Sequence, residues 1–135
     1  MAEFDWVSAR SECSLPKIFE RLYSGIKSDV AVRNKISAEA TERLEFGHSR
    51  EGPDRILVTR SGTKIRTVEF ILRQASIGVE GEAQFEADPG LNNPGDCTLT
   101  VNGTELELWA VRRLALEKLF FSNLSTLSRV TVNKA

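Results

Sequence analysis

His48 is the only histidine of the chain, so it is the one side chain suited to acid–base catalysis near neutral pH. A single histidine also rules out a metal site built from several imidazoles. His48 lies between Gly47 and Ser49 beside a turn-rich segment, where an exposed polar side chain is ordinary. An enzyme that uses His48 is therefore kept as an alternative and not as the leading interpretation.

The two cysteines, Cys13 and Cys97, are the candidate nucleophiles, with His48 as the base that would activate a thiol. Neither lies in a sequence typical of a cysteine hydrolase, and no CxxC pair is present. The chain starts without the basic stretch and apolar run of a secretion signal. We therefore expect a cytoplasmic protein with two free thiols rather than a structural disulfide.

The other groups that can do chemistry have simpler explanations. Glu105 and Glu107 are paired carboxylates two positions apart, but the predicted strand turns both toward water. The acidic and amide residues between positions 88 and 96 lack the spacing of a calcium loop, and no glycine-rich nucleotide motif occurs. We expect no catalytic residue set, no metal and no cofactor.

Arginines between positions 50 and 73 are the feature best suited to an anionic partner, because the guanidinium fork binds carboxylate and phosphate. Arg60 and Arg66 are the candidate anion-binding residues, although they flank a predicted turn that they could simply solubilise. Residues 74–108 contain seven acidic residues and no lysine or arginine, and the net charge of the chain is −1. Without an overall basic excess, nucleic acid is not an expected partner.

The clearest structural signal is a hairpin over residues 97–108, where two alternating runs meet at Asn102-Gly103. We expect Leu99 to pair with Leu106, so that the apolar side chains share one face of a sheet. Further short strands are predicted over residues 44–48, 56–60, 65–72, 76–79 and 83–86. Turns are predicted over residues 88–90 and 93–96.

Helices are predicted at both ends of the chain. The first begins after Ser14 and has apolar residues at helical spacing, but Gly25 and Asp29 weaken it, so residues 14–44 form one helix or two. Residues 4–7 are expected to form a short strand or an anchoring arm. The last helix is predicted over residues 108–121.

This order of elements predicts an α+β fold. It consists of an N-terminal helix, or two, then five or six mostly antiparallel strands, then a C-terminal helix packed on one sheet face. The close spacing of the strands argues against βαβ crossovers. We expect a single domain over residues 1–135, with a polar tail from about residue 123. No window approaches the roughly 18 consecutive apolar residues of a membrane helix, so no membrane partner is expected.

The last helix is more apolar than a helix on one sheet face needs to be. Trp109, Leu116 and Phe120 form a second stripe that the first helix, a ligand or another subunit must cover. We expect a non-enzymatic protein-interaction module that forms a homodimer, with these three residues as its partner-binding anchors. The second alternative is a carrier of a small apolar ligand, in a pocket lined by Phe70, Phe85 and Trp109.

Overall fold

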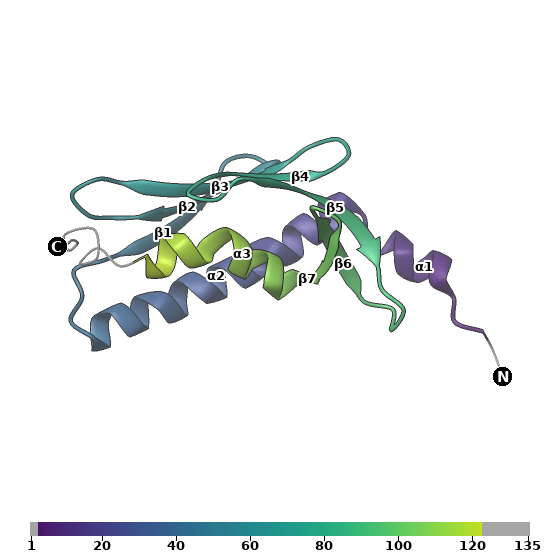
Figure 1. The fold of residues 1–135 in the computed structure, drawn as a ribbon, viewed down its shortest axis with the longest axis horizontal. Coiled ribbons are helices and arrows are strands. Elements are labelled where there is room, and N and C mark those ends of the chain that lie inside the picture. The colour runs from purple at the N-terminus through teal and green to yellow at the C-terminus, as the bar shows by residue number, and fades with distance from the viewer. Residues whose placement is uncertain (1–2, 123–135) are drawn as a thin grey trace.

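Three helices and a seven-stranded antiparallel sheet make up the computed structural model, which describes residues 3–122 (Figure 1). The helices are α1 (Trp6–Ser11), α2 (Leu15–Glu39) and α3 (Leu108–Phe121). The strands, which pair in chain order, are β1 (Phe46–Arg50), β2 (Arg55–Arg60), β3 (Arg66–Leu72), β4 (Ile77–Gly81), β5 (Phe85–Leu91), β6 (Cys97–Val101) and β7 (Thr104–Glu107). The α+β prediction is confirmed. The expected strand number of five or six is wrong, because every short alternating segment pairs with its neighbour in the chain.

The sheet changes direction within β5. Phe85 to Ala87 pair with β4, whereas Asp88 to Leu91 pair with β6. The turn predicted over residues 88–90 is therefore wrong: Pro89 pairs with Leu99, on the part of β5 that β4 no longer contacts. A proline without a backbone N–H is tolerated where one side of the strand needs no donor. As a result, β5, β6 and β7 turn away from the plane of β1 to β4 (Figure 1).

The structure decides between the alternatives for the N-terminal segment and corrects one expectation. Residues 15–39 form one unbroken helix, because the stretch from Gly25 to Asp29 continues the helical hydrogen bonding. The predicted strand or arm over residues 4–7 is replaced by the start of α1, where Asp5 accepts hydrogen bonds from the backbone N–H and the hydroxyl of Ser8. An acidic residue that accepts from the third residue after it is a standard start of a helix.

α2 and α3 cover the same face of the sheet, and the core lies between them and the strands (Figure 1). Phe19, Ile56, Phe70, Leu99 and Leu119 are among its fully buried side chains. The opposite face carries Glu69, Glu80 and Glu86 together with the apolar Leu57 and Ile71. No helix of the described part of the chain is both long enough and apolar enough to cross a membrane.

The hairpin at the end of the sheet has the predicted register. Leu99 pairs with Leu106 and Val101 with Thr104. Asn102 and Gly103 form the turn with φ values of 51° and 81°. Two consecutive residues with positive φ are what a two-residue turn needs to match the twist of the strands, which is why Asn-Gly is favoured there.

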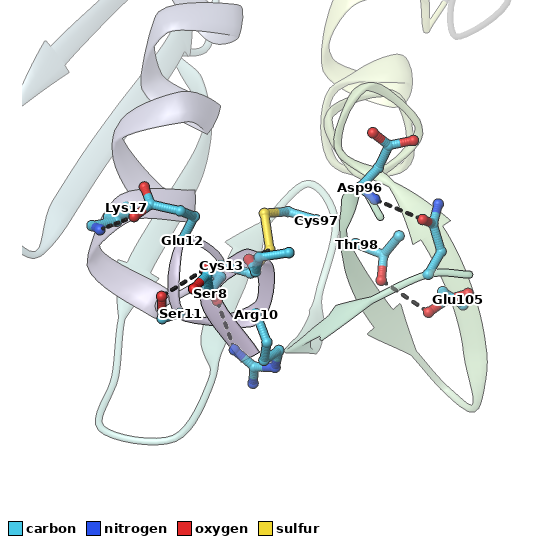
Figure 2. The surroundings of a disulfide bond; sticks show 12 residues. Ser8, Arg10, Ser11, Glu12, Cys13, Lys17, Asp96, Cys97, Thr98 and Glu105 are labelled. Atoms are coloured by element: carbon cyan, nitrogen blue, oxygen red, sulfur yellow. Dashed lines mark hydrogen bonds and ion pairs between the residues drawn. A yellow bond between two sulfur atoms is a disulfide. The ribbon is translucent and has the colours of Figure 1, made fainter. Parts of the chain in front are cut away.

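A disulfide joins Cys13 to Cys97, which contradicts the expectation of free thiols (Figure 2). Cys13 is fully buried in the turn between α1 and α2, and Cys97 begins β6 on the core side of the sheet. Their Cα atoms are 5.3 Å apart although 84 positions separate them in the chain. This distance suits a disulfide. The bond fastens the N-terminal turn to the bent half of the sheet.

Candidate functional site: the groove between α2 and α3

The apolar stripes of α3 differ in how far they are buried. The helix begins and ends where the sequence predicts, and Val111, Ala115 and Leu119 face the sheet. Leu116 and Phe120, from the second stripe, are also buried, with exposed fractions of 2% and 7%. Trp109 stays 53% exposed and Phe121 60% exposed. Helix α2 therefore covers part of the apolar surplus and leaves the rest in contact with solvent.

Between α2 and α3 lies a groove of about 400 Å³, here called the α2–α3 groove. From α3, Trp109, Leu116 and Phe120 all line it, so the structure brings the three predicted partner-binding anchors to one site. From α2, Val32 and Ile36 line it, and both are exposed. The three anchors differ in exposure: Trp109 lies on the surface, whereas the buried Leu116 and Phe120 form the floor of the groove.

Charged residues of both signs border the α2–α3 groove. Arg112 Nε donates to Asp29 Oδ2 at 2.7 Å, which ties α3 to α2 at a half-buried position. Arg113 Nε donates to Glu117 Oε1 at 3.2 Å, and this pair is exposed on α3. The groove is thus an apolar strip with a mixed charged rim, as in many protein interfaces.

Arg33 closes one end of the α2–α3 groove. Its Nε donates to the carbonyl oxygen of Phe120 at 2.9 Å, and its Nη1 lies 2.9 Å from Glu42 Oε1. The guanidinium carbon also lies over two aromatic rings, 4.7 Å from the centroid of Phe46 and 4.9 Å from that of Phe121. These contacts offset the cost of burying a charge and fix the last turn of α3 against α2.

The predicted anion-binding pair does not solubilise a turn. Arg60 and Arg66 pair with each other across β2 and β3, so both side chains point to the helix-covered face. Arg60 is 1% exposed and its Nη1 donates to the carbonyl oxygen of Leu119 at 2.9 Å. Both arginines donate to the hydroxyl of Ser122, which follows α3.

The candidates for catalysis and for a ligand pocket lie elsewhere. His48 is exposed on β1, with its Nδ1 3.3 Å from the hydroxyl of Tyr23. Phe70 is fully buried in the core and Phe85 is half-buried on β5, whereas Trp109 lines the α2–α3 groove. The structure therefore does not gather these three aromatic residues around a common space. Among residues 3–122 no cluster of His, Cys, Asp or Glu could hold a metal ion.

Sequence reasoning missed the α2 side of the groove. Val32 and Ile36 are four positions apart and so lie on one side of a helix. That spacing was visible in the sequence. The sequence left open whether residues 14–44 form one helix or two, so it did not place these residues beside α3.

Fold and groove define this chain as a small α+β domain in which a bent antiparallel sheet packs against two helices. Comparison with known proteins finds no matching family model, and no significant match among curated proteins or solved structures.

Proposed function

We propose that this chain is a non-enzymatic protein-interaction module that forms a homodimer through the α2–α3 groove. The observation that carries the proposal is the gathering of Val32, Ile36, Trp109 and Phe121 around one groove, all of them exposed. Single exposed apolar residues are ordinary on a protein surface, but a contiguous group on two adjacent helices is typical of an interface.

The charges at the rim favour a second copy of this chain over a partner of one sign. On α3, Arg113 precedes Glu117 by one helical turn, and both line the groove. In a two-fold dimer the same patch meets itself in the opposite direction. Arg113 of one copy then approaches Glu117 of the other, so the pair that closes within one helix can also close between copies.

The floor of the groove suits this role because it is rigid. Leu116 and Phe120 are held by the core, and Arg33 and Arg112 tie α3 to α2 by hydrogen bonds of 2.9 Å and 2.7 Å. A preformed surface loses little conformational freedom on binding. Trp109 is then the aromatic anchor, since large aromatic residues near the centre of an interface carry much of the binding energy.

The experiment compares Trp109→Asp with Ile65→Asp by sedimentation velocity. Both changes replace an exposed apolar side chain with a carboxylate, but Ile65 lies in the loop between β2 and β3, outside the groove. We expect the unchanged chain and Ile65→Asp to sediment as dimers and Trp109→Asp as a folded monomer. Equal sedimentation of the two variants would refute the proposed interface, and circular dichroism checks that both remain folded.

A further inference from the structure

Three arginines meet at the C-terminal end of α3: Arg33, which also lines the α2–α3 groove, and Arg60 and Arg66, which do not. Arg33 donates to the carbonyl oxygen of Phe120, and Arg60 to that of Leu119. Arg60 Nη1 and Arg66 Nη1 donate to Ser122 Oγ at 2.8 Å and 3.1 Å. Cations near the last carbonyl groups stabilise a helix, so part of this cluster is explained as a helix cap.

The cluster holds more positive charge than a helix end requires. A helix C-terminus carries about half a negative charge, and Arg33 is already paired with Glu42. Within residues 3–122, neither Arg60 nor Arg66 has a carboxylate oxygen within 4.0 Å. Burial, and then the charge of Arg66, lowers the pKa of the Arg60 guanidinium, while the more distant Glu82 acts in the opposite direction.

Arg60 also has a buried donor that is unused among the described residues. Arg60 is 1% exposed, and its Nη2 has no hydrogen-bond partner in the part of the chain that the structure describes. A buried donor without an acceptor destabilises the fold, and the loss is larger for a charged group. An additional oxygen beside Arg60 would remove that penalty.

The cluster is accessible from solvent on the side of Ser122. Arg66 and Ser122 are half-buried rather than buried. Ser122 lines a surface pocket of about 670 Å³ together with Arg33, Arg43 and Thr63. Glu42 is the one carboxylate of that lining, and it is paired with Arg33. A small anion can therefore reach the hydroxyl that both Arg60 and Arg66 contact.

We propose that Arg60, Arg66 and Ser122 form a binding site for a small oxyanion of the phosphate or carboxylate type. The Ser122 hydroxyl oxygen accepts hydrogen bonds from both guanidinium groups, so its position shows where these arginines stabilise an oxygen atom of the anion. Arg60 Nη2, which has no partner in the described part of the chain, supplies a further donor. Arginine forks favour such oxygens because two donors of one group can bind two acceptors of the other. Arg60, Arg66 and Ser122 do not line the α2–α3 groove, so this proposal does not rest on the homodimer.

The first test measures thermal unfolding of the full chain against inorganic phosphate and, separately, acetate, with chloride holding the ionic strength constant. Ligands that bind the folded state raise the midpoint in a saturable way. We expect such a rise with at least one of the two anions, and which one acts identifies the chemistry of the ligand. Arg66→Gln is expected to weaken the apparent affinity at least tenfold, whereas Arg21→Gln, which removes an equal charge from an exposed position on α2, leaves it unchanged. The absence of a saturable rise, or equal responses of the two variants, would overturn the proposal.

Ser122→Asp tests the excess charge without any added ligand. A carboxylate beside Arg60 and Arg66 is expected to raise the unfolding midpoint and to remove the response to the added anion. At an ordinary helix C-terminus a negative charge lowers stability. If the cluster held no excess positive charge, Ser122→Asp would therefore lower the unfolding midpoint. Ser24→Asp, at an exposed position on α2, controls for the change in net charge. A lowered midpoint for Ser122→Asp relative to Ser24→Asp would contradict the proposed site.

Discussion

The guanidinium of Arg112 on α3 lies directly over Gly25 of α2, so closely that a Cβ atom at position 25 would clash with it. From there its Nε donates to Asp29 Oδ2 at 2.7 Å. A glycine in the middle of a helix is unfavourable relative to alanine by roughly 0.5–1 kcal/mol. The close approach of Arg112 explains why glycine nevertheless occupies this position, and it fixes how the two helices that form the groove meet.

A double-mutant cycle tests this contact. We expect Gly25→Ala to change the free energy of unfolding of the unchanged chain by less than about 0.5 kcal/mol, because the gain in helix propensity is offset by displacement of Arg112. In an Arg112→Ala background the same change has nothing to displace, and we expect it to stabilise by about 1 kcal/mol. Urea denaturation of the four proteins measures both values. Equal effects in the two backgrounds would show that Arg112 and Gly25 are not coupled.

Substitutions at Leu116 and Trp109 are expected to act differently: the first lowers the stability of the monomer, whereas the second weakens dimerisation. Leu116 is 2% exposed, so Leu116→Ala leaves a cavity and should lower the free energy of unfolding by about 2–5 kcal/mol. Trp109 is 53% exposed, and Trp109→Ala should change the stability of the monomer by no more than about 1 kcal/mol. Denaturant unfolding at a concentration below that of dimerisation makes the comparison. A loss for Trp109→Ala as large as that for Leu116→Ala would place Trp109 in the core.

Asn34 protects the exposed edge of the sheet. Its side chain accepts from the backbone N–H of Phe46 at 2.8 Å and donates to the carbonyl oxygen of the same residue at 2.9 Å, in the place of another strand. We expect Asn34→Ala to destabilise the protein by about 1–3 kcal/mol, since two backbone groups lose their partners. Open edges also invite association. Light scattering on heating measures that association, with Lys35→Ala as the control from the neighbouring surface position; equal scattering and stability of the two variants would show that Asn34 has no protective role.

The disulfide is expected to contribute substantially to stability. A cross-link between residues separated by 84 positions restricts the unfolded chain by about 4.5 kcal/mol in the chain-entropy account. We expect Cys13→Ala, Cys97→Ala and the double variant to lose similar amounts, because either single change breaks the bond. Chemical denaturation of the oxidised chain and the three variants measures the loss. A double variant as stable as the oxidised chain would contradict this role of the bond.

The disulfide also bears on the cellular compartment in which the protein functions. Disulfides persist in oxidising compartments and are rare in the cytoplasm, so the bond argues against the cytoplasmic location that the sequence predicts. Alkylation of the freshly isolated, denatured chain counts its free thiols. We expect none, and two free thiols would favour the cytoplasm.

Features set by local chemistry could be predicted from the sequence, whereas those set by distant contacts could not. The turn at Asn102-Gly103 and the extent of α3 depend on neighbouring residues, and both predictions are confirmed. The Cys13–Cys97 bond depends on how the sheet bends around the helices, which no local pattern records.

The inward direction of the Arg60 side chain also depends on more than local sequence, because it is set by the register of the β2–β3 hairpin. Five loop residues, 61–65, separate β2 from β3, so Arg60 pairs with Arg66 and both lie on the face of Val58 and Val68. A one-residue change in loop length reverses the face of every side chain in a strand. The strands predicted over residues 56–60 and 65–72 do not by themselves fix the register of this hairpin, so the sequence could not show that these arginines meet the end of α3.

Sedimentation equilibrium of the unchanged chain over a dilution series tests the central claim most directly, because assembly through the α2–α3 groove must depend on concentration. We expect a monomer–dimer equilibrium in which the weight-average mass approaches 15.0 kDa on dilution and twice that mass at high concentration. A mass that stays at 15.0 kDa throughout the series would contradict the homodimer.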